Sequence, residues 1–129
     1  MRAPCSYDYA IVRVVPRVER EEFINAGVIL SCPELDFLDA RIELDERRLL
    51  ALDATVDVDS LRANLASIPI ICAGGPSAGP IGRMSPRERF HWLVAPRSTM
   101  IQMSSVHTGR CRDPAQALGH LVQTMVRSR

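Results

Sequence analysis

The alternation of hydrophobic and polar residues is strictest in residues 37–44, FLDARIEL. Apolar side chains at every second position are separated by charged ones, which predicts a strand with one buried and one solvated face. Residues 7–16 and 22–32 are rich in β-branched and other apolar residues and predict two earlier strands. The first has apolar side chains on both faces, so we expect it at the centre of a sheet. Gly27, inside the second, predicts a bulge or a close backbone approach.

Two helices are expected in the middle of the chain, each after an acidic capping residue. Asp45 precedes a short helix at residues 46–53. Asp57 or Asp59 precedes a longer one, which Pro69 breaks or kinks and which residues 70–73 can continue beyond the proline. The expected buried face of the longer helix carries Leu61, Leu65 and Ile68.

Two further helices have clear start signals. Ser85 and Glu88 flank Pro86 in the pattern of a capping box, which predicts a helix over residues 86–95. Asp113 is followed by Pro114 and predicts the start of the last helix. The expected buried stripe of this helix is Leu118, Leu121, Val122 and Met125.

The remaining segments complete the predicted fold. Residues 33–36 are a short connection that favours an antiparallel hairpin. Residues 74–82 are expected to be a loop because of their Gly and Pro content. Residues 98–104 are expected to form a fourth strand, and residues 106–113 a loop. The order of elements predicts an α+β fold, with an antiparallel sheet of about four strands and helices packed mainly on one face. The length of 129 residues favours a single domain over residues 1–129.

Composition excludes several classes of protein. There is no Lys, so a Schiff-base mechanism and a Walker-type phosphate loop are both excluded. No apolar run approaches the ~20 residues of a membrane span, and the N-terminus lacks the apolar centre of a secretory signal, so we expect a cytoplasmic protein. The 4 Cys residues are far apart in the sequence, which favours buried thiols over a zinc ribbon or a redox motif.

Charge is distributed unevenly although the net charge is only +1. Residues 1–60 contain 7 Arg and 13 acidic residues, whereas residues 61–129 contain 9 Arg and 2 acidic residues. Such a division indicates a basic patch that faces an anion, or two parts that attract each other or a second copy of the chain.

The candidate chemistry lies between Arg87 and Cys111. An Arg next to two hydroxyl groups suits a phosphate or carboxylate, which makes Arg97, Ser98 and Thr99 candidate anion ligands. The other candidate ligand-binding residues are Arg87 and Thr108, and the candidate acid–base residues are His107 and His91. His120, on the last helix, receives no role. The His spacing does not match a helical metal site, so we expect neither a metal nor a cofactor.

Three segments resemble the bacterial DUF3037 family: residues 7–30, 89–102 and 104–109. The resemblance runs roughly from Tyr7 to the last helix, and the stretch from Arg89 to Gly109 combines rare residue types in a fixed order. The family has no known function, so the resemblance supplies no catalytic residues. Its members are often encoded beside a kinase-like protein of the HipA type, which implies a protein partner.

Three functions compete at this point. We favour a non-enzymatic accessory module that binds a protein, with a homodimer through a strand edge or the last helix as a further expectation. The first alternative is a small enzyme or sensor for a phosphorylated or carboxylated metabolite, which requires Arg97 and His107 within about 10 Å of each other. The second, less favoured, is a nucleic-acid-binding module. It requires a surface stripe of Arg83, Arg87, Arg89, Arg110 and Arg112.

Overall fold

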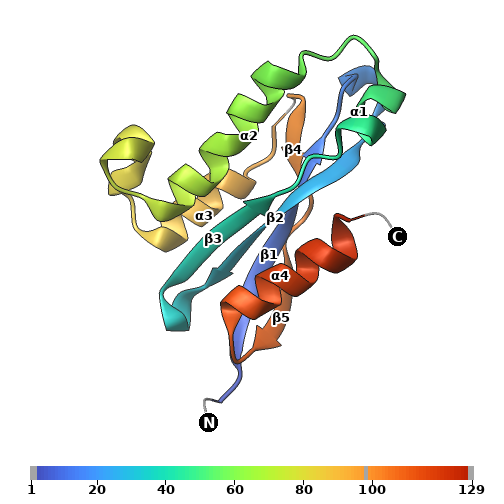
Figure 1. Cartoon of the computed structure of the whole chain (residues 1–129). Coiled ribbons are helices and arrows are strands. Elements are labelled where there is room, and N and C mark those ends of the chain that lie inside the picture. The colour runs from blue at the N-terminus through green and yellow to red at the C-terminus, as the bar shows by residue number, and fades with distance from the viewer. Residues whose placement is uncertain (1–2, 98, 128–129) are drawn as a thin grey trace.

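A single antiparallel sheet organises the computed structural model, which describes residues 3–97 and 99–127. Its strands are β1 (Cys5–Val14), β2 (Ile24–Cys32), β3 (Phe37–Ile42), β4 (Ile101–Met103) and β5 (His107–Cys111). β1 lies at the centre, as predicted, because β2 pairs with one of its edges and both β4 and β5 pair with the other (Figure 1). The predicted α+β class and the antiparallel sheet are confirmed.

The prediction of a loop at residues 106–113 is wrong, because residues 107–111 form strand β5. Its register on β1 runs from Cys5 opposite Cys111 to Tyr9 opposite His107. The sequence His-Thr-Gly-Arg has little intrinsic strand preference, but the free edge of β1 offers it backbone hydrogen bonds. Gly109 fits there because a Cβ atom at its position would lie 2.5 Å from the Tyr7 ring.

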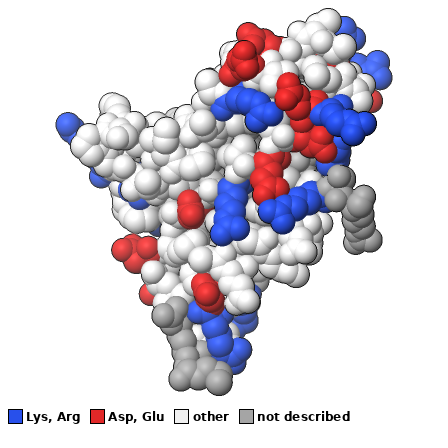
Figure 2. Space-filling model, in the orientation of Figure 1, with Lys and Arg blue, Asp and Glu red and all other residues white. Residues whose placement is uncertain are grey.

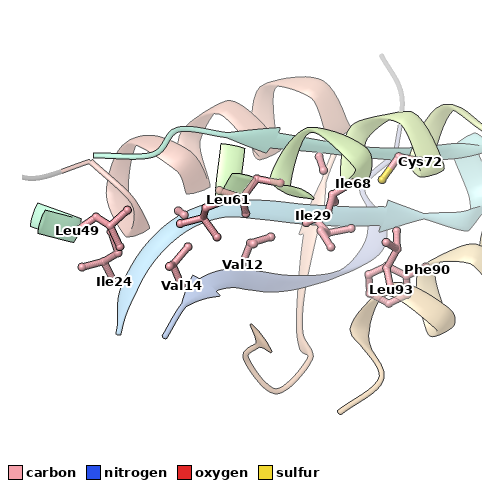
Figure 3. Packing of buried hydrophobic residues seen from close by; sticks show 13 residues of the cluster. Val12, Val14, Ile24, Ile29, Leu49, Leu61, Ile68, Cys72, Phe90 and Leu93 are labelled. Carbon is pink, nitrogen blue, oxygen red and sulfur yellow. The ribbon is translucent and has the colours of Figure 1, made fainter. Parts of the chain in front are cut away.

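Helices cover both faces of the sheet. α1 (Glu46–Leu52), α2 (Val58–Ala73) and α3 (Pro86–Val94) share one core with the first face, and α4 (Pro114–Met125) packs on the second, where it crosses in front of the sheet in Figure 1. The predicted caps are present: Asp45, Asp57 and Asp113 accept backbone N–H bonds, and Ser85 and Glu88 form the capping box. The larger core contains Val12, Val14, Ile29, Leu61, Phe90 and Leu93 (Figure 3).

α2 continues through Pro69 to Ala73, as one of the two alternatives allowed, and Ile68 and Cys72 keep both sides of the proline on the core. Two local predictions differ from the structure. The predicted loop at residues 74–82 is largely the 3-10 helix η3 (Pro76–Arg83), with a non-helical break at Gly79. On α4, Met125 is 39% exposed and Val126 is buried in its place.

Shorter 3-10 helices connect the first strands, as η1 (Val18–Arg20) and η2 (Pro33–Leu35). Within residues 3–97 and 99–127, no single helix has the length and apolar character to cross a membrane. Only α2 and η3 taken together reach the length and apolar composition of a span, and these two helices are bent by 60° at their junction.

Candidate functional site

Arg87, a candidate anion ligand, is engaged within the fold. One of its guanidinium nitrogens lies 2.6 Å from an Asp8 carboxylate oxygen, and another donates to the Ser31 hydroxyl at 3.0 Å. These contacts connect α3 to β1 and β2. Thr108 on β5 lies opposite Asp8 in the sheet, so it belongs to the same polar row. The row is therefore a structural bridge between a helix and the sheet.

Arg97 is held against an aromatic ring after the end of α3. Its guanidinium carbon lies 4.4 Å from the centroid of the Trp92 ring, and one nitrogen donates to the Trp92 carbonyl at 2.8 Å. The Thr99 hydroxyl donates to the Ile101 carbonyl at 2.8 Å, so it serves the local backbone. Ser98, the third member of the predicted anion site, lies outside the described residues.

Neither candidate acid–base histidine has an acidic neighbour in hydrogen-bond contact among the described residues. His107 is exposed on β5, where its ring lies 5.4 Å from the Tyr9 ring and 3.5 Å from the Ser105 hydroxyl. His91 is exposed on α3, and its ring meets the edge of Phe90 at a centroid distance of 5.9 Å. Both histidines make contacts that are typical of surface packing.

The sheet register separates the predicted anion site from His107. Arg97 precedes β4, in which Ile101 lies opposite Val14, whereas His107 lies opposite Tyr9. These two positions are five residues apart on β1, a length of about 16 Å at 3.3 Å per residue. The register therefore gives no support to the separation of about 10 Å that a shared catalytic site of Arg97 and His107 requires.

Arg89 has no place in a nucleic-acid-binding stripe. Its side chain is buried and donates to the backbone carbonyls of Met84 and Cys72. Because Arg87 is also paired with Asp8, two of the five arginines that the stripe requires are engaged in contacts within the fold.

A groove that the sequence did not reveal lies between α2 and the segment that joins α3 to β4. It has a volume of about 420 Å³. Its floor and walls are mainly apolar, with Leu61, Ile68, Ile71, Trp92, Leu93 and Met100 among them. Asp57, Ser60 and Asn64 stand on its α2 side, and Arg97 and Thr99 stand on the opposite side. Its walls come from segments about 35 residues apart in the chain, which is why no local pattern could indicate it.

A long uncharged stretch adjoins this groove, although Asp57 and Arg97 line the groove itself. No charged residue occurs between Arg62 and Arg83, a stretch that covers most of α2 and nearly all of η3. Figure 2 shows the same lobe of the molecule almost free of charge, whereas charges of both signs gather over the opposite end of this face. Ile70 and Trp92 are 45% and 38% exposed. This part of the surface is therefore suited to an uncharged contact.

The cysteines are not arranged as a reactive centre. Cys5, Cys32 and Cys72 are buried and Cys111 is half-buried, which confirms the expectation of buried thiols. Burial raises the pKa of the Cys111 thiol, and the neighbouring Cys32 thiol raises it further. A raised pKa leaves little thiolate, which is the nucleophilic form. Among the described residues, no group of three or more His, Cys, Asp or Glu side chains is placed to hold a metal ion.

Comparison with known proteins identifies the family. No curated protein and no solved structure matches the chain. The family model described as "Protein of unknown function (DUF3037)" matches residues 9–126, which is most of the chain and includes the groove, the candidate residues and every strand except the first four residues of β1. The chain therefore belongs to the DUF3037 family, whose function is unknown.

Proposed function

We propose that this protein is a non-enzymatic module that binds an apolar, uncharged segment of a partner protein in the groove between α2 and α3–β4. The observation that carries the proposal is the groove itself, an apolar depression of about 420 Å³ that adjoins a surface without charged residues. An uncharged surface is complementary to an uncharged partner, because a charged one would lose its hydration without compensation.

The polar edge of the groove favours a peptide chain as the occupant. Ser60 and Asn64 lie one helical turn apart on α2, and their side chains make no hydrogen bond to another described residue. Hydroxyl and amide groups in this position can bond to the backbone of an extended segment. Trp92, half exposed at the groove, is the residue type that most often anchors such contacts.

The candidate residues give less support to an enzyme. The sheet register places His107 about 16 Å along β1 from Ile101, which follows Arg97 in the chain. Direct or single-water proton transfer requires a few ångströms. A binding role places no such demand on the two residues.

The partner that the family resemblance implies is the kinase-like protein of the HipA type. The test is a titration of this purified kinase-like protein with the natural chain and with Asn64→Arg, in which binding is measured by biolayer interferometry. We expect Asn64→Arg to weaken binding at least about tenfold, because it places a charge and a long side chain at the edge of an apolar groove.

Ala63→Arg provides the matched control. Ala63 is exposed on the same helix, one residue away, and does not line the groove. Its replacement adds the same charge and length and should change affinity less than about twofold. Absence of binding by the natural chain, or equal affinities for the two variants, would overturn the proposal.

A further inference from the structure

A second pocket lies on the other side of Arg97, between the ends of β1 and β4 and the segment that leads into β2. Its volume is about 430 Å³. Two arginines line it, Arg13 from β1 and Arg97 from the start of the β4 segment. The lining also includes polar and acidic side chains, from Gln102 and Glu21, and apolar side chains, from Phe23 and Val18. The pocket therefore combines cationic and apolar surface.

Arg13 is a half-buried cation without an anionic partner. Its guanidinium carbon lies 4.3 Å from the centroid of the Phe23 ring. Its Nε atom is buried and has no hydrogen-bond partner, and Arg13 forms no ion pair among the described residues. A buried N–H group without an acceptor costs free energy. The terminal guanidinium nitrogens of Arg13 also make no hydrogen bond to another described residue, and they are the donors that a ligand in the pocket would use.

The guanidinium group of Arg97, like that of Arg13, lies over an aromatic ring. The Trp92 ring covers one face of the group, and only one of its nitrogens donates, to the Trp92 carbonyl. Stacking on a ring occupies the face of a guanidinium and leaves the N–H groups in its plane free to donate. Both arginines are thus fixed in orientation by an aromatic side chain and retain unused donors.

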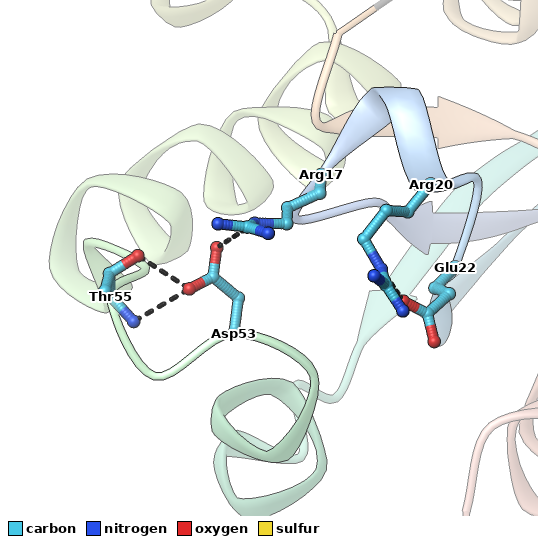
Figure 4. Close-up of polar contacts among 5 residues, drawn as sticks. All are labelled: Arg17, Arg20, Glu22, Asp53 and Thr55. Atoms are coloured by element: carbon cyan, nitrogen blue, oxygen red, sulfur yellow. Dashed lines mark hydrogen bonds and ion pairs between the residues drawn. The ribbon is translucent and has the colours of Figure 1, made fainter.

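Two acidic residues outside the lining are already paired with other arginines. Glu22 pairs with Arg20, and Asp53 lies 3.7 Å from Arg17, whose neighbours Val15 and Val18 line the pocket (Figure 4). Glu21 is the acidic residue that lines the pocket, and it follows η1 in a left-handed conformation with φ 56°. Two guanidinium groups against one carboxylate leave a net positive charge, which favours an anion.

We propose that this pocket binds the oxyanion of a small organic molecule, a carboxylate or a phosphate, between Arg13 and Arg97, with the apolar part of the molecule against Phe23 and Val18. Planar guanidinium groups donate two parallel bonds to such oxyanions. Phe23 and Val18 are 44% and 38% exposed, so they are available to the apolar part. This site adjoins the groove of the proposed function, because Arg97 lines both, whereas Arg13 lines only the second pocket.

The test is a titration of ¹⁵N-labelled protein with phenyl phosphate, in which the chemical shifts of the backbone amides are measured at each addition. We expect saturable shifts centred on Arg13, Phe23 and Gln102. Arg13→Gln and Arg97→Gln should each weaken binding at least about tenfold, because each removes charge-assisted hydrogen bonds. Benzoate or inorganic phosphate, which carry the two kinds of oxyanion, should compete with phenyl phosphate.

Arg110→Gln controls for the loss of one positive charge. Arg110 is exposed on β5, donates to the Pro4 carbonyl at 3.3 Å and does not line this pocket. Its replacement should change affinity less than about twofold. If Arg13→Gln does not fold, the exposed Arg97 still tests the site. Shifts scattered away from the pocket, no competition by either anion, or the same affinity for Arg97→Gln and Arg110→Gln would refute the proposal.

Discussion

Arg89 shows how one buried charge fixes a corner of this fold. It is 8% exposed and donates to the Cys72 carbonyl at 3.2 Å and to the Met84 carbonyl. Cys72 belongs to the last turn of α2, where carbonyls lack partners within the helix and a cation is favourable. Gly74 leaves room for this side chain, because a Cβ atom there would lie 2.9 Å from the guanidinium carbon. Arg89 therefore joins the end of α2 to α3.

Replacement of Arg89 by Met tests this role. The variant keeps much of the side-chain volume but leaves two carbonyls without their donor, at about 1–3 kcal/mol each. We expect the free energy of unfolding to fall by about 2–5 kcal/mol, measured by urea denaturation. Arg47→Met, at an exposed position of α1, should change it by no more than about 0.5 kcal/mol. Equal urea midpoints for the two variants would show that the Arg89 hydrogen bonds do not stabilise the fold.

At the scale of elements, a bulge in β2 decides which side chains face which core. Register on β1 shifts after Val12, which lies opposite Gly27, to Arg13, which lies opposite Asn25. Ile24 and Ala26 consequently face the core beneath α1 and α2, whereas Val28, Leu30 and Cys32 face α4. The extra residue thus places Ile24 and Ala26 on the same face as Ile29, whereas strict alternation would place them on the face of Val28 and Leu30.

Gly27→Ala should destabilise the protein because of this arrangement. The added Cβ atom would lie 2.6 Å from the Arg41 carbonyl oxygen, which is backbone and cannot move aside. We expect a loss of about 1–3 kcal/mol in the free energy of unfolding, from overpacking. Gly119→Ala is the opposite case, because its Cβ would meet only the end of the Arg41 side chain at 3.1 Å. That variant should gain up to about 1 kcal/mol from helix propensity, and thermal unfolding should resolve the opposite signs.

The elements also show what the sequence could and could not predict. Ser85 and Gly27 were identified correctly because a capping box and a strand glycine depend on residues close in the chain. Strand β5 was missed because its pairing depends on the free edge of β1, about 100 residues away. Arg13 was missed as a candidate because a strand arginine carries no signal of its own, and only the fold brings it beside Arg97.

At the scale of the whole molecule, ionisable groups limit stability at both ends of the pH range. Hydrogen bonds from Thr55 hold the pKa of Asp53 below its usual value, and a hydrogen bond from Arg127 does the same for Glu43. Carboxylates with a lowered folded-state pKa stabilise the fold above their unfolded pKa, and that contribution is lost as pH falls through the folded pKa. Stability should therefore decline in acid, below about pH 4.

Cys72 lowers the stability of the fold at alkaline pH. Burial raises the pKa of this thiol from 9.0 to about 12, and the Asp39 carboxylate adds to the increase. The folded state therefore keeps a proton that the unfolded state releases above about pH 9, so stability falls as pH rises towards the folded pKa. The expected slope from this group is up to about 1.4 kcal/mol per pH unit.

Cys72→Ala removes this titration and tests its contribution. At neutral pH the variant should lose about 1 kcal/mol, since the cavity left by one sulfur atom is small. Between about pH 9 and 10.5, its free energy of unfolding should fall less steeply with pH than that of the natural chain, as measured by urea denaturation at each pH. Below pH 8 the two profiles should run parallel, including the acidic decline, which arises from carboxylates that the substitution leaves in place. Parallel profiles above pH 9 as well would mean that the thiol ionises equally in the folded and unfolded states, and would contradict the burial of α2 against the sheet.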